Sequence, residues 1–192
     1  DLGIEVIIQL FSEKGLRQIF SQVKKQKKIS KNASRIIQLE HSYIQVIEEV
    51  MAFLQHKNPT LAFSICERSF LPEAERFAQI DDLEWSFGAI GVQDKAKYLA
   101  TLFLEDLGDL ITEAVDPYFG FSRYAERLGM SASSYDTLHS KLQEPLTLID
   151  TLTIELLDAL IKKEHPTLIC FSIPFPGNLY SALRCGQFVK RQ

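Results

Sequence analysis

Residues 172–178, Ser-Ile-Pro-Phe-Pro-Gly-Asn, carry the groups best suited to holding a ligand. Ser172 and Asn178 supply a hydroxyl and an amide, while Pro174 and Gly177 disfavour both helix and strand, so the chain turns there. Asn178 is suited to cap a following helix, whose free N–H groups can hold a phosphate or an amide oxygen. The sequence therefore predicts a cofactor-binding loop formed by Ser172, Pro174, Gly177 and Asn178. A plain connection between two elements is the alternative.

Two other groupings of polar residues are weaker candidates for catalysis. Adjacent carboxylates occur at Glu48–Glu49, Asp81–Asp82 and Glu105–Asp106. Neighbours on a helix do not share a face, so these pairs are poor general acid–base partners. His139 lies near Asp136 and Ser140, but consecutive helical residues point apart and no oxyanion loop accompanies them. The sequence thus predicts no catalytic residue in this chain.

The three cysteines, Cys66, Cys170 and Cys185, are scattered and set among apolar neighbours. An odd number at irregular spacing is typical of reduced structural thiols, and it favours neither disulfides nor a metal site. We therefore expect no metal centre and a cytoplasmic protein.

An aromatic-rich pair of loops offers a second candidate site. Its members are Trp85, Phe87, Tyr118, Phe119, Phe121 and Tyr124, close to Gly88, Gly91 and Gly120. Such residues either fill the core beneath connecting loops or line a cleft for a peptide or a cofactor. Both interpretations stay open.

Composition excludes several classes of function. The chain has 192 residues, of which 46% are apolar, and its net charge is -4. That charge, without a long basic stripe, argues against nucleic-acid binding, and the basic run 24–28 is typical of a solvated helix end. No apolar run approaches the length of a membrane span, and no signal peptide is recognisable, so we expect no membrane partner.

Apolar side chains recur at helical spacing along most of the chain, most clearly over residues 33–55, 94–111 and 146–163. The one stretch that indicates a strand is 167–173, a β-branched and aromatic run bounded by prolines. The sequence thus predicts a mainly α fold with one strand near residues 167–173.

A buried strand that leads into a Gly/Pro loop and a helix is typical of open α/β sheets. The helical stretch before residue 167 is far longer than an ordinary crossover between parallel strands. We therefore expect a partial α/β, Rossmann-like unit formed by residues 1–12 and 164–192. A helical insertion, residues 13–163, interrupts it, and the first strands of the sheet precede Asp1.

Three segments carry a resemblance to a known family: Asp1-Leu-Gly-Ile-Glu-Val, Leu10-Phe-Ser-Glu-Lys-Gly-Leu and Phe171-Ser-Ile-Pro-Phe-Pro-Gly-Asn. They resemble the amino-terminal region of radical S-adenosylmethionine (SAM) proteins with a B12-binding-type domain. In that family an open parallel sheet precedes a catalytic barrel, and a serine-bearing loop touches the cobalamin. The resemblance implies cobalamin as the cofactor of the 172–178 loop. It places S-adenosylmethionine and a [4Fe-4S] cluster only in the parent protein.

Two signatures of these cofactors are absent from the sequence: Asp-x-His-x-x-Gly, which ligates cobalt, and Cys-x-x-x-Cys-x-x-Cys, which ligates the cluster. The resemblance therefore implies a non-catalytic accessory fragment of a radical SAM oxidoreductase or methyltransferase. Its partner would be the catalytic radical SAM domain of the same polypeptide, together with a peptide or small-molecule substrate. The alternative is a helical module that has lost cofactor binding and recognises a peptide or protein.

Overall fold

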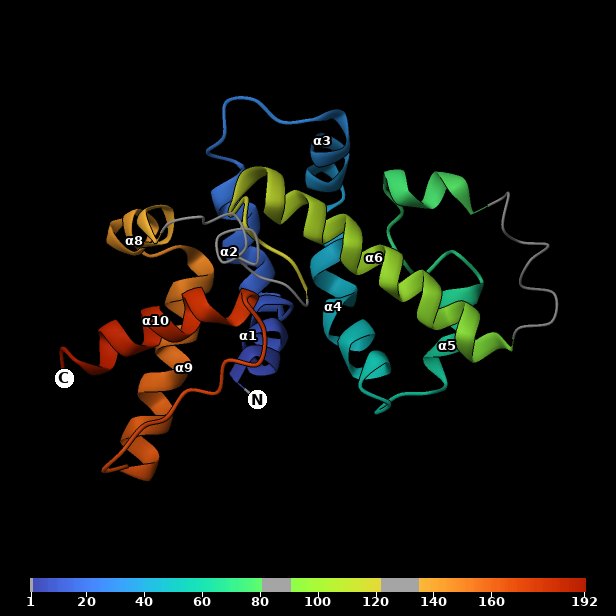
Figure 1. The fold of residues 1–192 in the computed structure, drawn as a ribbon. Coiled ribbons are helices and arrows are strands. Elements are labelled where there is room, and N and C mark those ends of the chain that lie inside the picture. The colour runs from blue at the N-terminus through green and yellow to red at the C-terminus, as the bar shows by residue number, and fades with distance from the viewer. Residues whose placement is uncertain (1, 81–90, 122–134) are drawn as a thin grey trace. The chain divides into compact units, whose positions relative to one another are not determined.

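The computed structural model describes residues 2–80, 91–121 and 135–192, and within these ranges the chain is mainly helical (Figure 1). The mainly α fold class is confirmed. Backbone contacts divide the chain into two compact units: one is Phe11–Ala114, and the other combines Asp1–Leu10 with Val115–Gln192.

The unit Phe11–Ala114 is built around its longest described helix, α6 (Val92–Ala114), which contacts every other described helix of the unit. The others are α2 (Glu13–Val23), α3 (Lys31–Gln38), α4 (Glu40–Leu54), α5 (Leu61–Cys66) and the 3-10 helix η1 (Glu75–Gln79). Leu99, Phe103 and Leu107 recur every fourth residue on the buried side of α6. This spacing gives one continuous apolar face, which accounts for the central place of the helix.

Polar side chains fix where the helices of this unit begin. The Ser12 hydroxyl accepts the N–H of Gly15 at 3.1 Å, and the Ser30 hydroxyl accepts the N–H of Ala33 at 3.0 Å. The prediction of one helix over residues 33–55 is wrong, because the chain leaves helical geometry at Leu39 (φ -93°, ψ 8°). No glycine or proline marks this break, so the sequence contains no local signal for it.

The second unit brings together both ends of the chain. Its described helices are α1 (Leu2–Leu10), α8 (Asp136–Gln143), α9 (Leu148–Glu164) and α10 (Gly177–Val189). α1 packs along α9, while α10 packs against α8 and α9. Leu138, Leu142 and Tyr180 form a buried apolar cluster between α8 and α10, flanked by Tyr118, Leu179 and Leu183.

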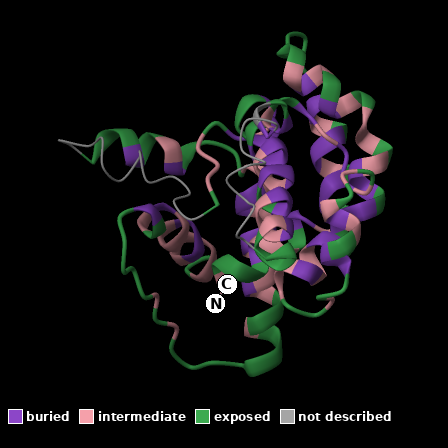
Figure 2. Ribbon diagram, turned by 90° about the vertical axis from the view of Figure 1, so that its right-hand side faces the viewer, coloured by how far each residue is buried: buried purple, intermediate pink, exposed green. Residues whose placement is uncertain are grey.

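The predicted strand over residues 167–173 is not formed. Residues 166–176 make an irregular connection between α9 and α10, and most of them are exposed (Figure 2). The physical reason is the lack of a partner, because a strand exists through hydrogen bonds to a neighbouring strand and the described residues contain none. The described residues therefore show no Rossmann-like unit.

The predicted domain boundaries joined residues 1–12 to 164–192 and treated 13–163 as an insertion. In the structure the unit with both chain ends resumes at Val115. α8 and α9 belong to this unit because they pack with α10 and α1.

α9 begins with a reciprocal capping box, which yields a direct test of the helix boundary. The Thr147 hydroxyl accepts the Asp150 N–H, and the Asp150 carboxylate accepts the Thr147 N–H, both at 3.1 Å. Thr147→Ala is expected to lower the free energy of unfolding by about 1 kcal/mol in urea denaturation. The control, Thr167→Ala in the exposed connection, should change it by less than about 0.5 kcal/mol. Equal losses in the two variants would contradict the cap.

Candidate functional site

The four predicted cofactor residues lie at the end of the connection between α9 and α10. Ser172 and Pro174 are exposed, Gly177 is buried as the first residue of α10, and Asn178 is exposed in its first turn. The predicted Asn178 cap is wrong, because the N-cap position is Pro176, which makes no side-chain hydrogen bond. The described part of the chain places no sheet edge beside this loop, and cobalamin binding by these four residues stays a prediction.

The backbone of the connection is largely unpaired. Within the described ranges no hydrogen bond involves the backbone from Thr167 to Pro174. Bonding resumes where the Asn178 N–H donates to the Phe175 carbonyl at 3.0 Å. A row of free N–H and C=O groups is what the edge strand of a sheet presents to another strand.

Exposure alternates over five residues of this stretch, from Leu168 to Ser172. Leu168, Cys170 and Ser172 are exposed, while Ile169 and Phe171 between them are partly buried. Successive side chains of an extended chain point to opposite sides, so this period of two indicates a strand-like backbone without a neighbouring strand.

Residues 167–175, called the exposed segment below, also concentrate apolar surface. Leu168 is 77% exposed, Phe175 68% and Ile173 44%. No charged residue occurs from Pro166 to Leu183. Large apolar side chains gathered at the surface are typical of interaction sites, since burying each one contributes about 1.5–3 kcal/mol.

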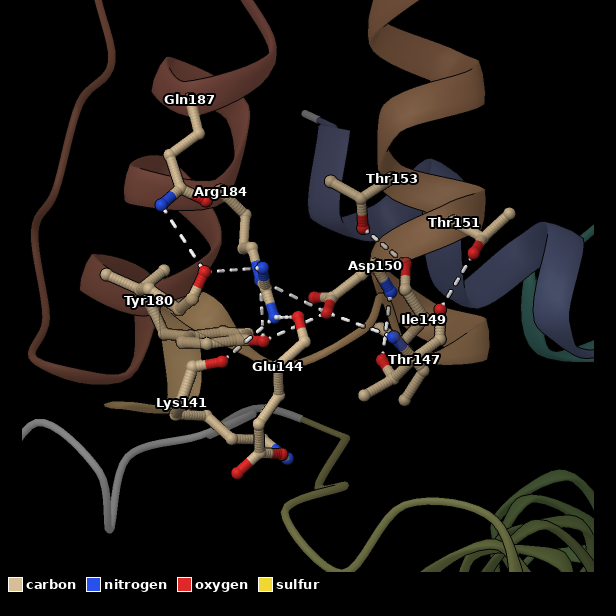
Figure 3. Close-up of polar contacts among 11 residues, drawn as sticks. Lys141, Glu144, Thr147, Ile149, Asp150, Thr151, Thr153, Tyr180, Arg184 and Gln187 are labelled. Atoms are coloured by element: carbon tan, nitrogen blue, oxygen red, sulfur yellow. Dashed lines mark hydrogen bonds and ion pairs between the residues drawn. The ribbon is translucent and has the colours of Figure 1, made fainter. Parts of the chain in front are cut away.

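A buried polar cluster holds the helix that follows the exposed segment (Figure 3). Arg184 of α10 is 5% exposed, and its Nε donates to the Tyr180 hydroxyl at 2.8 Å. Its terminal nitrogens donate to the carbonyls of Leu142 at 2.9 Å and of Lys141 and Glu144 at 3.0 Å. These carbonyls lie at the C-terminal end of α8, where a cation is favoured by the helix dipole.

Asp150 of α9 completes the cluster from the opposite side. It is 2% exposed, and its Oδ2 lies 3.3 Å from Arg184 Nε. The same oxygen accepts the Tyr180 hydroxyl at 2.9 Å and the Thr147 N–H at 3.1 Å. Because the carboxylate lies at the N-terminus of α9 and the guanidinium at the C-terminus of α8, the ion pair ties α10 to both helices.

The ionisable groups around this cluster are not activated for nucleophilic chemistry. Burial raises the pKa of the Tyr180 hydroxyl, which therefore remains a neutral donor. Burial, and then the charge of Asp150, raises the pKa of the Cys185 thiol to about 11. Outside this cluster, in the unit Phe11–Ala114, burial also raises the pKa of Cys66. Reactive cysteines have lowered pKa values, so these thiols are not activated as nucleophiles. The role that the contacts of the cluster support is the positioning of helices.

The aromatic residues singled out by the sequence separate in the structure. Trp85, Phe87 and Tyr124 lie outside the described residues. Tyr118 packs against the apolar cluster of α8 and α10, with its ring centroid 5.1 Å from Lys141 Nζ. Phe119 and Phe121 form an edge-to-face pair with centroids 5.3 Å apart, and Phe121 is 40% exposed. Tyr118 thus fills core space, and the cleft interpretation of these loops stays a prediction.

The sequence analysis missed the polar cluster, although two local signals for it exist. Tyr180 and Arg184 are four residues apart and share one face of α10. Thr147 and Asp150 have the spacing of a capping box ahead of an apolar run. Neither signal shows that the two pairs meet, because that contact depends on how α10 folds back over α8 and α9.

No family model matches the chain, and neither a curated protein nor a solved structure matches it. Across the described ranges, no group of three or more His, Cys, Asp or Glu side chains is placed to hold a metal ion. Among those same residues, no helix combines the length and the apolar character needed to cross a membrane.

The buried ion pair predicts an asymmetric response to mutation. Arg184→Met leaves the Asp150 charge buried without its partner, so the free energy of unfolding should fall by about 3–5 kcal/mol. Adding Asp150→Asn should restore part of the loss, because the orphaned charge is removed. Urea denaturation followed by circular dichroism measures both changes. The control Arg191→Met, at an exposed position of the same unit, should have an effect within about 0.5 kcal/mol. A loss as small for Arg184 as for Arg191 would show that the pair is not structural.

Proposed function

We propose that this chain is a helical protein-interaction module whose exposed segment, residues 167–175, adds as a strand to the edge of a β-sheet in a partner protein. The observation that carries the proposal is the combination of an unpaired backbone with alternating, largely apolar side chains in one segment.

A sheet edge satisfies both features at once. Its free N–H and C=O groups pair with those of the segment, and its flanking side chains cover Leu168, Ile173 and Phe175. A second copy of the chain is a poorer partner, since its described residues contain no strand and therefore offer no sheet edge. Two strands on their own form a marginal sheet in water.

Both ends of the exposed segment are restrained, which favours recognition. α9 ends at Glu164, and the left-handed backbone of its C-cap, His165 (φ 45°, ψ 52°), turns the chain out of the helix. α10 is fixed by the Arg184 cluster, and Pro166, Pro174 and Pro176 limit the conformations between. A segment restrained in this way loses less entropy when it binds.

The resemblance to radical SAM proteins stays a prediction that is compatible with strand addition. In that case the sheet edge would belong to a B12-type domain of the same polypeptide, and the exposed segment would complete its sheet. The described residues supply no sheet, so no cofactor chemistry is assigned to Ser172 or Asn178.

Strand addition depends on backbone amides, so proline substitution separates it from side-chain docking. Cys170→Pro removes an N–H that has no partner in the isolated chain, and proline tolerates extended backbone. We expect Cys170→Pro and Cys170→Ala to unfold within about 0.5 kcal/mol of each other. With a partner bound, amide hydrogen exchange over residues 167–173 should slow in the alanine variant and remain fast in the proline variant.

The partner itself can be located by photo-crosslinking in cell extract. Phe175→p-benzoylphenylalanine should crosslink to a protein with an open sheet edge. The control Phe63→p-benzoylphenylalanine, at a similarly exposed site of α5 (63% against 68%), should not give that product. Only alternate N–H groups of an added strand bond to the partner, so Phe171→Pro and Phe171→Ala are compared in the same way. Once the partner is purified, equal protection in the proline and alanine variants at both positions would refute strand addition. Identical crosslinks from positions 63 and 175 would refute the site.

The cobalamin prediction has a separate spectroscopic test. If it holds, the visible absorption of hydroxocobalamin shifts on mixing with the longer polypeptide that the resemblance implies. The shift should disappear in the double variant Ser172→Ala, Asn178→Ala, because these residues would touch the cofactor. An unchanged spectrum with the unsubstituted polypeptide would rule out cobalamin and leave the strand-addition proposal standing.

A further inference from the structure

The unit Phe11–Ala114 buries one carboxyl group without a compensating charge. Asp106 of α6 and Tyr43 of α4 are both 0% exposed. Asp106 Oδ2 and Tyr43 Oη have no hydrogen-bond partner among the described residues. Buried polar atoms are nearly always paired in folded proteins, so two such atoms in one core require an explanation.

The nearest cation does not neutralise Asp106. The Arg76 guanidinium of η1 is directed to two other carboxylates, Asp109 at 2.8 Å and Glu105 at 3.0 Å. Asp106 Oδ1 accepts the backbone N–H of Arg76 at a long 3.5 Å. The backbone N–H of Ala74 also interacts with the Asp106 carboxyl group and lowers its pKa. Asp106 therefore contacts the start of η1 through neutral amides.

The charges on the surrounding elements do not change this balance. Glu73 precedes η1 and is paired with Arg68 at 2.8 Å, while α3 contributes Arg35, which acts on Tyr43. On α2, Glu13 and Arg17 pair with each other at the surface, and Lys14 is exposed. The titratable group of α5, Cys66, donates to the Val92 carbonyl.

Burial is the largest cause acting on the acid. It raises the pKa of Asp106 to about 6; the amides and the charge of Arg76 lower it, and the charge of Asp109 raises it. Burial also raises the pKa of Tyr43, with Asp106 as the second cause, so the phenol remains a neutral donor. A neutral carboxylic acid in this core removes the uncompensated charge and adds an O–H donor.

We propose that Asp106 is a proton-operated latch between α6 and η1. With a proton taken from solvent, its carboxyl group is a neutral acid that lies in the core and keeps η1 against α6. When the proton returns to solvent, the core holds a buried negative charge that the amides of η1 offset only in part, and the hydration of this charge loosens η1 from α6.

The direction of the pH dependence follows from the raised pKa. The unfolded chain holds this proton only below about pH 4, whereas the folded chain holds it up to about pH 6. The stabilisation is therefore complete below pH 4 and is lost as the pH rises from 4 through 6. A difference of about two pKa units corresponds to about a 100-fold change in the unfolding equilibrium constant.

The variant Asp106→Asn tests the latch because it keeps the shape of the side chain and cannot ionise. The equilibrium constant for unfolding is measured by urea denaturation at pH 4 and pH 8, at constant ionic strength. Between these two pH values it should rise about 100-fold more in the wild type than in Asp106→Asn. The control Asp94→Asn removes an exposed carboxylate of the same helix and should retain most of the wild-type change. The same pH dependence in wild type and Asp106→Asn would overturn the proposal.

Two measurements on the wild-type chain keep the test independent of whether the variant folds. The carboxyl ¹³C signal of Asp106 should titrate with a midpoint near 6, and a midpoint near 4 would overturn the proposal. Amide hydrogen exchange at η1, corrected for its intrinsic pH dependence, should accelerate above that midpoint. Exchange that stays unchanged through the titration would show that the acid does not act on η1.

Discussion

The buried pair of Arg184 and Asp150 is the interaction on which the unit containing both chain ends depends. Each charge lies where a helix terminus favours it, the guanidinium on the last carbonyls of α8 and the carboxylate in the first turn of α9. Because both groups belong to one cluster, α10 has a fixed place on α8 and α9. The exposed segment that leads into α10 is therefore held at its far end, while its backbone from Thr167 to Pro174 makes no hydrogen bond within the described residues.

The two buried aspartates of this chain show how surroundings determine the role of one residue type. Asp150 faces a guanidinium and two further donors, so its charge is compensated and the group is structural. Asp106 accepts hydrogen bonds only from backbone amides, since the guanidinium of its neighbouring arginine is paired with surface carboxylates. The first arrangement fixes helices through a paired charge, whereas the second makes a helix contact depend on a proton.

Much of the helical framework could be predicted from the sequence, because apolar periodicity and caps are local. The helix expected over 146–163 is observed as Leu148–Glu164, and that over 94–111 lies within Val92–Ala114. The strand over 167–173 was wrong for a non-local reason. Its residues do favour an extended backbone, but pairing needs a neighbour that the described residues do not supply. The adjacent carboxylates Glu105 and Asp106 do not indicate by themselves that one of them is buried. Asp106 follows Phe103 at helical spacing, however, and this spacing places it on the apolar face of α6.

The sequence by itself determined the mainly α character of the chain, the boundaries of helices with polar caps, and the extended tendency of the stretch before Pro174. These properties depend on residues within a few positions of one another. Only the tertiary structure decided that Arg184 reaches the end of α8 and Asp150, that the apolar stretch before α10 is uncovered, and that Asp106 is buried without a counter-charge. Burial and charge compensation depend on residues about 30 to 45 positions apart, and no local pattern specifies them.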